Sequence, residues 1–546
     1  MRLYKYSKMK KSIKILGLVT ILMVGMSAIV IQNDKLFEIT KNIEIFANAF
    51  QKLNTNYVDE IDPSELMRIG IDAMVGSLDP YTNYISESQI ESYRLANEGK
   101  YQGMGVVIDK VGDYITILEA YEDGPALKAG LKVGDQIVEV NGFRTKGKST
   151  EEMNAIAKGV AGTTMNLRVK RAGEKKELDI ELIRGETIIP NVPYSGRVAD
   201  NIGYISLTVF TADAGKNISK ALVDLKKDGN LDGVIIDLRS NGGGLLREAI
   251  AICNIFLPQG MEVVATKGKI KERDRSFETM RPAVDTDIPI VVLTNKGSAS
   301  ASEIVSGVIQ DYDRGVVMGQ RTFGKGLVQN VEEIGYNSRV KLTTSKYYIP
   351  SRRCIQAVKY ENGKPVDIPD AERSKFKTAN GRVVLDGGGV APDVKLPAKE
   401  QSEYTKVLIS EKVIFNYINQ FTSNLDSIDA PGVFRYNDYA EFKSFVQKSG
   451  FEFKSELETK IGELKKGAEN GLSSDFDQLL SKLDGLQDNL IDTYQEEITK
   501  EIEIQIVTRY YFQSGKAKQK LNGDSEVQEA IALLNDPTKY NKILGK

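Results

Sequence analysis

Two short segments of this chain carry side chains that could perform nucleophilic catalysis. The first, Gly297–Glu303, has serines at positions 298, 300 and 302, and the second, Thr322–Gly326, holds a lone lysine, Lys325. The 546 residues include no histidine, which excludes the Ser-His-Asp and Cys-His designs that need an imidazole base. A hydrolase built from this chain must therefore deprotonate its nucleophile with another group, and a buried lysine is the main candidate.

Ser300 and Lys325 each have a second interpretation. Ser300 to Glu303 has the pattern of a helix capping box, which is purely structural, but a serine at a helix N-terminus also lies beside free amides that suit an oxyanion. Gly319–Lys325 satisfies the G-x4-G-K part of a phosphate-binding loop. Gly326 lacks the hydroxyl that would bind Mg²⁺, and the residues after it favour an extended strand, so we discard an NTPase.

A third segment, Asp237–Gly244, directly follows an apolar run that is typical of a buried strand. The glycines at its end leave the backbone free to turn several N–H groups toward one point. The segment could therefore supply half of an oxyanion hole, or it could be an ordinary turn from a strand to a helix. The residues of this segment leave both interpretations open.

Hydrophobic periodicity predicts four regions. Residues 34–86 favour amphipathic helices, 101–184 a compact module of short strands, 201–395 alternating strands and helices, and the residues after 400 charged helices. In the alternating region, which is typical of an α/β layer, the expected strands are 203–207, 233–237 and 289–293, and the expected helices are 214–226, 246–256 and 302–312. A further helix over 150–158 is expected after Ser149, because Ser149 and Glu152 have the spacing of a capping box.

The segment 1–33 has the composition of an export signal. Basic residues from Arg2 to Lys14 precede an uncharged stretch from Ile15 to Ile31, which predicts either an uncleaved signal-anchor or a signal peptide cleaved near Ser27-Ala28. The positive-inside rule places the remaining chain outside the cytoplasm. We therefore expect a protein of the cell envelope, in the periplasm or on the outer face of the inner membrane, anchored by its N-terminal segment.

The overall composition excludes other classes. Lys and Arg total 73 against 75 Asp and Glu, a net charge of −2, whereas a nucleic-acid-binding domain usually shows a basic excess. We expect no nucleic-acid partner. The two cysteines, Cys253 and Cys354, are too few for a thiolate metal cluster, and although an exported chain could join them, we expect them to be unpaired. No metal or organic cofactor is indicated.

The chemistry-bearing segments together resemble one family. Ser298–Ile304, Thr322–Gln329 and Asp237–Gly244 look like the core signatures of the C-terminal processing (tail-specific) serine peptidases. Further matching segments are Leu78–Thr82, Leu342–Ser351 and Gly388–Asp393. The resemblance covers Leu36 to Leu396, with the segments in the family's order.

The resemblance implies a role for each residue of a catalytic site. The nucleophile would be Ser300, the general base Lys325, the residue that orients the lysine Gln329, and the oxyanion donors the amides of Ala301 and of Gly243 or Gly244. The lysine must be neutral to accept the serine proton, and burial beside a residue such as Phe323 would lower its pKa from about 10.4 by several units. In extended backbone Lys325 and Gln329 would share one face.

The module over 101–184 resembles a PDZ domain. Gly103, Met104, Gly105 and Val106 look like its carboxylate-binding loop, and residues 124–142 match other parts of that fold. PDZ domains bind a peptide C-terminus by adding it to a sheet edge. This module would therefore deliver substrate tails to Ser300 or gate access to it.

These resemblances imply a multidomain α/β protein in which a PDZ module precedes a crotonase-like α/β Ser-Lys protease core, flanked by helical N- and C-terminal regions. The expected boundaries are 1–33 for the signal, 34–97 for the N-terminal helices, 98–185 for the PDZ domain, 186–398 for the core and 399–546 for the C-terminal helices. The expected function is that of a serine endopeptidase that cleaves exported proteins at or near apolar C-terminal tails through an acyl-enzyme, with an adaptor protein and a second copy of the chain as further partners. Two alternatives remain: a catalytically inactive PDZ scaffold that only binds tails, and a hydrolase of non-peptide amides.

Overall fold

The computed structural model describes residues 35–90, 98–356, 358–361, 364–367, 369–466, 473–486 and 489–546. The chain divides into two compact units between Tyr84 and Ile85, and each is described by itself. The predicted signal, residues 1–33, lies outside the described residues. In the described part of the chain, no helix combines the length and the apolar character that a membrane crossing requires.

The first unit contains two helices, over residues 35–56 and over α2 (Pro63–Gly76). Asp62 caps α2, since its Oδ1 accepts a hydrogen bond from the amide of Ser64 at 2.7 Å, and Pro63 occupies the first position, where no amide is needed. Most apolar side chains along the first helix are exposed, with Leu36, Ile43 and Leu53 as examples, and Phe50 is half-buried.

A small antiparallel sheet organises residues 100–188. Its strand order is β3-β4-β5-β7-β8, with β6 paired to β5, and β2 pairs separately with β9. The bounds of its elements are β2 (Lys100–Gly103), β3 (Val106–Val111), β4 (Tyr114–Ala120), α4 (Pro125–Lys128), β5 (Gln136–Val140), β6 (Phe143–Arg144), α5 (Thr150–Ala157), β7 (Thr164–Lys170), β8 (Leu178–Ile183) and β9 (Gly185–Ile188). Alternate residues face inward as period-2 strands require, so Ile115, Ile117, Ile137 and Val169 are fully buried beside Met153 of α5.

A six-stranded, mostly parallel sheet forms the largest layer, in the order β10-β11-β12-β15-β16-β23. Its elements are β10 (Tyr194–Ala199), β11 (Ile202–Ser206), α6 (Ala214–Lys227), β12 (Gly233–Asp237), α7 (Leu246–Phe256), β15 (Ile290–Thr294), α8 (Ala301–Asp311), β16 (Val316–Gly319) and β23 (Val394–Lys395). Only β10 runs antiparallel to its neighbour. The central strands β12 and β15 are buried along their whole length, as expected for a parallel sheet covered on both faces.

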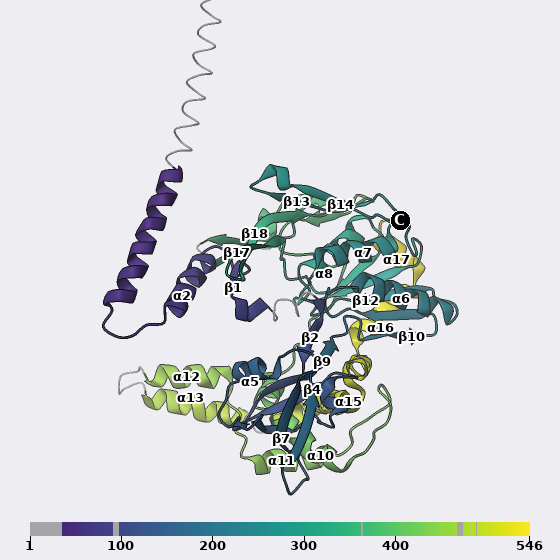
Figure 1. Ribbon diagram of the computed structural model, residues 1–546. Helices are drawn as coiled ribbons and strands as arrows, with labels where there is room; N and C mark the ends of the chain where they lie inside the picture. Colours follow the sequence, from purple (N-terminus) through teal and green to yellow (C-terminus); the bar gives the residue numbers. More distant parts are fainter. Residues whose placement is uncertain are drawn as a thin grey trace, which may run out of the picture. The chain divides into compact units, whose positions relative to one another are not determined.

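The two faces of this sheet are covered by different parts of the chain. Helices α6, α7 and α8 cover one face, where Val234, Ile236 and Val292 join their core (Figure 1). The other face, with Ile235 and Val291, packs against α16 (Ser525–Leu534) and α17 (Pro537–Ile543). The packing of the core therefore extends beyond the residues 186–398 assigned to it from the sequence.

A second, antiparallel sheet contains β14-β13-β18-β17, and its strand β13 packs against α7 and α8. Its strands and the small hairpins nearby are β13 (Glu262–Gly268), β14 (Arg275–Glu278), β17 (Leu327–Gly335), β18 (Ser338–Tyr348), β19 (Val358–Glu361), β20 (Lys364–Asp367), β21 (Lys375–Lys377) and β22 (Val383–Leu385). Strand β17 begins directly after the segment that holds Lys325, so this sheet fixes the end of that segment.

The C-terminal region is helical, as predicted. It contains α9 (Glu403–Ser410), α10 (Val413–Phe421), α11 (Tyr439–Ser449), α12 (Glu456–Lys466), α13 (Ser473–Leu486), α14 (Leu490–Thr493) and α15 (Gln495–Lys520). Leu408, Ile418, Phe442 and Ile502 are fully buried in its own core. The long helix α15 is interrupted at Phe512, where φ is 52° and ψ is −150°, and its last turns contact the PDZ-like module through Lys516 and Glu119 at 2.5 Å.

Candidate active site

Ser300 lies at the turn between β15 and α8, immediately before the first residue of the helix. Its backbone adopts φ 57° and ψ −113°, a conformation that costs energy for any residue with a Cβ and is concentrated at functional sites. The turn places the residue at the N-terminus of α8, where the first amides have no partner within the helix and the dipole favours negative charge. The position therefore suits an anion that forms beside Ser300.

The structure distinguishes the three serines of this turn, which composition alone cannot do and among which the family resemblance selects Ser300. Ser298 and Ser302 are fully buried, and their hydroxyls donate to the carbonyls of Leu238 at 2.7 Å and Asn241 at 2.8 Å. Ser300 is partly exposed. Of the three, it is the one whose side chain a substrate can reach.

Glu303 contributes more than the capping pattern read from the sequence. Its fully buried carboxylate accepts hydrogen bonds from the amides of Ser300 and Lys325 at 2.8 Å each, and from the amide of Gly324 and the hydroxyl of Thr322 at 2.6 Å each. Burial raises the pKa of Glu303 to about 7, an effect that these hydrogen bonds oppose. One side chain thus joins two segments: residues 295–300, here called the nucleophile turn after the role expected of Ser300, and residues 320–326, the lysine loop.

Lys325 is half-buried in the loop between β16 and β17. The hydroxyl of the buried Tyr347 contacts its carbonyl and lies 3.1 Å from the carbonyl of Ser300. The amide of Phe323 also donates to the carbonyl of Ser298 at 2.9 Å, so the main chains of the two segments are joined at several points. The Phe323 side chain itself is 53% exposed and gives the lysine less apolar cover than the sequence suggested.

Gln329 lies in β17, where its Nε2 donates to the hydroxyl of Thr343 at 3.2 Å. The sequence argument that Lys325 and Gln329 share one face of a strand is wrong. Lys325 lies in the loop before β17, which begins at Leu327, and the register of the strand shifts between Val328 and Gln329. The period-2 rule does not apply across such a loop and bulge.

The glycine loop, residues 238–244, packs directly on the nucleophile turn. A Cβ at Gly243, whose φ is 97°, would lie 2.7 Å from the carbonyl oxygen of Ala299, 2.8 Å from Cβ of Ser300 and 2.9 Å from the amide nitrogen of Ala301. The Gly243 amide donates to Oδ1 of Asn241 at 2.9 Å. Gly244, with φ 145°, follows it. The backbone of Gly243 thus packs against Ser300 and Ala301, and its N–H, one of the two glycine amides expected to bind an oxyanion, is donated to Asn241.

Sequence reasoning missed Glu303, Tyr347 and Asn241 as parts of this site. Glu303 was assigned to the cap, and neither Tyr347 nor the Asn241 side chain has a local pattern that points to its contacts. A carboxylate in the first turn of a helix that is buried along its whole length is the signal that could have singled out Glu303, because buried carboxylates need several donors.

The PDZ-like module holds a separate groove. A cavity of about 220 Å³ lies between β3 and α5, and its apolar lining includes Met104, Val106, Ile108, Tyr121 and Ala157. In the loop before β3, Gly105 has φ 77°, and the carbonyls of Met104 and Gly105 accept hydrogen bonds from Ala126 at 2.8 Å and Tyr121 at 3.0 Å. The predicted residues Gly103–Val106 therefore form an ordered turn beside an apolar groove, and the binding of a terminal carboxylate there stays a prediction.

No group of three or more Cys, Asp or Glu side chains in the described ranges is arranged to hold a metal ion. Within these ranges Cys253 and Cys354 are both free, as expected. Burial raises the pKa of each thiol, so neither is primed as a thiolate nucleophile.

Three segments of the chain match models of known protein families. Family models match as follows: PDZ domain over residues 102–182, Peptidase family S41 over 201–368, and Probable PDZ-protease, C-terminal helical domain over 404–534. The solved photosystem II D1 C-terminal processing protease matches with 25% identity and a TM-score of 0.35, over 64% of this chain and 92% of that chain.

Two curated relatives are each 34% identical to this chain. A carboxy-terminal-processing protease of Bartonella bacilliformis matches over 338 residues, 61% of this chain and 77% of its own length. A probable CtpA-like serine protease of Staphylococcus aureus matches over 331 residues, 60% of this chain and 65% of its own length. The chain therefore belongs to the carboxy-terminal-processing serine proteases of peptidase family S41.

Proposed function

We propose that this protease cleaves peptide bonds through an acyl-enzyme, with Ser300 as nucleophile and Lys325 as general base. One observation carries the proposal: the accessible serine of the turn and the lysine have their backbone amides bound to the same oxygen of Glu303, at 2.8 Å each. This link fixes the backbones of two residues that are 25 positions apart in the sequence, and a base and its nucleophile must be held in such a fixed arrangement.

The reaction follows the general course of acyl transfer. Neutral Lys325 takes the proton of the Ser300 hydroxyl as its oxygen attacks the peptide carbonyl carbon, and the new C–O bond gives a tetrahedral oxyanion. The Ala301 amide and a glycine-loop amide donate to that oxyanion, each worth about 3 kcal/mol. The C–N bond then breaks, the leaving amine takes the proton from Lys325, and water hydrolyses the ester with Lys325 again as base. Gln329 serves as the residue that orients the lysine.

Substrates are proteins with apolar C-terminal tails that carry a free carboxylate. The apolar groove of the PDZ module and the turn at Gly103–Val106 support this choice. The module binds the tail and thereby delivers it to Ser300 or gates the site. The Lys516–Glu119 ion pair, which joins the module to α15, supports such communication with the rest of the protein.

The substrates and the protease meet in the cell envelope. This part of the proposal rests on the basic and then apolar N-terminal segment, which favours export and anchoring. An adaptor protein and a second copy of the chain are the further partners that we assign.

The test uses purified full-length protein, a substrate with an apolar C-terminal tail and a serine-reactive fluorophosphonate probe. Ser300→Ala and Lys325→Ala should each abolish cleavage, and the probe should label the wild type but not Ser300→Ala. Lys296→Ala is the matched control, because Lys296 lies in the same turn and its side chain is 80% exposed.

Cleavage by Lys325→Ala at the wild-type rate would refute the assigned base. A protein that binds tails but neither cleaves them nor reacts with the probe would be the inactive scaffold. Labelling of the wild type that removal of the Ser300 hydroxyl leaves unchanged would move the nucleophile elsewhere.

A further inference from the structure

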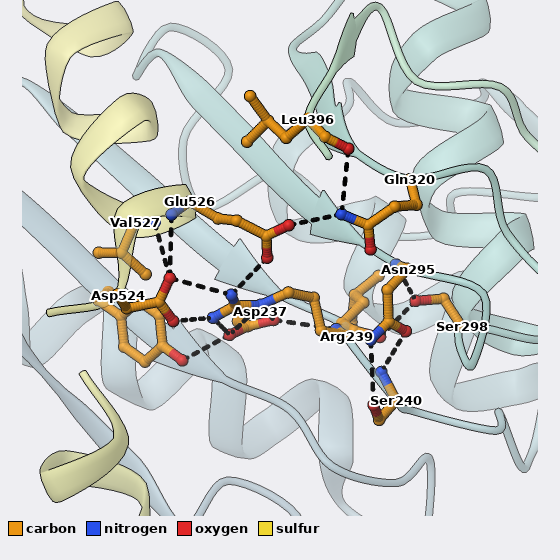
Figure 2. Close-up of polar contacts among 12 residues, drawn as sticks. Asp237, Arg239, Ser240, Asn295, Ser298, Gln320, Leu396, Asp524, Glu526 and Val527 are labelled. Carbon is orange, nitrogen blue, oxygen red and sulfur yellow. Dashed lines mark hydrogen bonds and ion pairs between the residues drawn. The ribbon is translucent and has the colours of Figure 1, made fainter. Parts of the chain in front are cut away.

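The guanidinium of Arg239 joins the glycine loop to the C-terminal end of the chain (Figure 2). Arg239 follows β12, and its Nη2 lies 2.6 Å from Oδ2 of Asp237 and 2.8 Å from Oδ2 of Asp524. Its Nη1 lies 2.6 Å from Oε2 of Glu526. Asp524 is the N-cap of α16 and Glu526 lies in the first turn of that helix, so this contact joins segments that are 285 positions apart in the sequence.

The four charged groups form a shielded cluster. Their side chains are only 9–18% exposed, and one guanidinium faces three carboxylates. Burial opposes the charge of Arg239, but the carboxylates of Asp237 and Asp524 more than compensate and raise its pKa. The planar fork of arginine suits several carboxylates at once, so these ion pairs are far less screened than those on an open surface.

Glu526 also contacts the start of the lysine loop. Its Oε1 accepts a hydrogen bond from Nε2 of Gln320 at 2.5 Å, and Gln320 directly follows β16. The same nitrogen lies 3.3 Å from the carbonyl of Leu396. Figure 2 shows Glu526 between Arg239 and Gln320. The Glu526 carboxylate therefore binds a residue near the start of the glycine loop and a residue at the start of the lysine loop.

The other side of the glycine loop is fixed by the nucleophile turn. The Ser240 amide donates to Oδ1 of Asn295 at 2.7 Å, and Nδ2 of Asn295 donates to the Ser240 hydroxyl at 3.1 Å. The amide of Ala299 donates to the carbonyl of Asn241 at 2.9 Å. The loop is thus clamped between the C-terminal segment and the turn that presents Ser300, and a movement of Arg239 would be carried to both.

We infer that residues 524–526 are a positioning element of the active site, in which Asp524 and Glu526 hold the glycine loop and the lysine loop in register around Ser300. The inference rests on the proposed roles of Ser300, Lys325 and the glycine-loop amides. Asp524 and Glu526 touch no reacting atom; they act through Arg239 and Gln320. The C-terminal helices therefore belong to the catalytic apparatus as well as to the core.

The test removes the negative charges of Asp524 and Glu526 in the full-length protein and keeps the shapes of the two side chains. Asp524→Asn retains an N-cap residue, and Glu526→Gln retains the size of the side chain. With a quenched peptide that ends in an apolar residue, the double variant should lose at least tenfold in kcat with KM changed less than twofold. The rate of fluorophosphonate labelling at Ser300 should fall in parallel, and amide hydrogen exchange in peptides covering 238–244 should accelerate.

Glu529→Gln, an exposed residue of the same helix, should leave all three measurements unchanged. The two single variants, Asp524→Asn and Glu526→Gln, each keep one of the two carboxylates. A kcat that recovers in either single variant relative to the double variant would support the inference. All rates are divided by the folded fraction from thermal melts, so a wild-type kcat per folded molecule overturns the inference even if the variant is less stable. Ser300→Ala separates the two proposals: if it abolishes labelling while the double variant reacts normally, the catalytic assignment stands and the positioning role fails.

Discussion

The backbone amide of Lys325 donates a hydrogen bond to Oε2 of Glu303 at 2.8 Å. The same oxygen accepts a hydrogen bond from the amide of Ser300 at 2.8 Å. Glu303 therefore fixes the backbones of the proposed nucleophile and the proposed base relative to each other and does not occupy their side chains through these two bonds. Because four donors converge on one buried carboxyl group, two on each oxygen, each of them depends on both oxygens as acceptors.

Glu303→Gln should therefore impair catalysis strongly. The amide replaces one acceptor oxygen by a donor, which leaves at least one buried N–H unpaired at a cost of about 1–3 kcal/mol. We expect kcat to fall at least tenfold, which corresponds to the lower part of that range. Thr322→Val removes one donor and leaves the amides in place, so its effect should be smaller. Steady-state kinetics should give kcat values that fall from wild type to Thr322→Val to Glu303→Gln. Equal kcat values for wild type and Glu303→Gln would contradict this prediction.

The stability of the protein should depend on pH through Glu303. Its pKa is raised from 4.5 to about 7 in the folded state, so folding takes up a proton between these values. This contribution to stability is complete below pH 4.5 and is lost as the pH rises to 7, by about 3 kcal/mol. Urea unfolding at pH 5 and pH 8 should show a larger loss in wild type than in Glu303→Gln. Identical pH dependence in the two proteins would mean that Glu303 is ionised throughout.

Local patterns predicted much of the α/β layer. The expected strand 233–237 and helix 246–256 have the observed bounds of β12 and α7, and 302–312 differs by one residue at each end from α8. These elements have strong hydrophobic periodicity or continuous apolar runs, which depend on nearby residues. Ser300, Lys325 and the glycine loop were selected for a different reason, because each lies in a short segment that resembles a signature of the peptidase family.

Contacts between distant segments could not be predicted in this way. Nothing near Glu526 indicates that it binds Arg239 and Gln320, and nothing near Tyr347 indicates its contact with Ser300. The strand expected after Gly326 is present as β17, but it begins at Leu327 and its register shifts between Val328 and Gln329, so the strand does not include Lys325. Such features depend on the folded arrangement and leave no periodic signal.

Gly243→Ala should damage the oxyanion site, and Gly242→Ala should not. A Cβ at Gly243 would come within 3.0 Å of Ala299, Ser300 and Ala301 at a φ of 97°, whereas a Cβ at Gly242 meets nothing within 4 Å. Displacement of the donors should lower kcat of Gly243→Ala about 100-fold, the usual cost of one oxyanion donor. Steady-state kinetics and fluorophosphonate labelling of Gly243→Ala and Gly242→Ala test this prediction. Equal kcat values for the two variants would show that the loop accommodates the Cβ at Gly243 without loss of activity.

Gly105→Ala should weaken tail binding at the PDZ module. Its Cβ would lie 2.8 Å from Cδ of Pro125 and 2.9 Å from the hydroxyl of Thr187, at a φ of 77°. Gly112→Ala is the matched control, because its φ of 64° is similar and no atom lies within 4 Å. Fluorescence anisotropy with a labelled peptide of apolar C-terminus should show at least tenfold weaker binding for Gly105→Ala. Equal affinities for the two variants, or for the free and the amidated peptide, would place the tail elsewhere.

Arg353→Ala should destabilise the core far more than Arg352→Ala. Arg353 and Asp311 are each 1% exposed and lie 2.9 Å apart, and Nη2 of Arg353 also donates to Gln310 of α8 at 2.8 Å. Truncation leaves the Asp311 charge buried without its cation, which costs about 3–5 kcal/mol. The neighbouring Arg352 pairs with Glu262 and is 61% exposed, so its loss should cost less than about 1 kcal/mol. Urea unfolding of the two variants measures the difference. Gln310 and Asp311 are the last residues of α8, the helix that Ser300 caps. Arg353→Ala should therefore also broaden the thermal transition of the protease core. Similar free energies of unfolding for both variants would show that Asp311 is neutral in the folded protein.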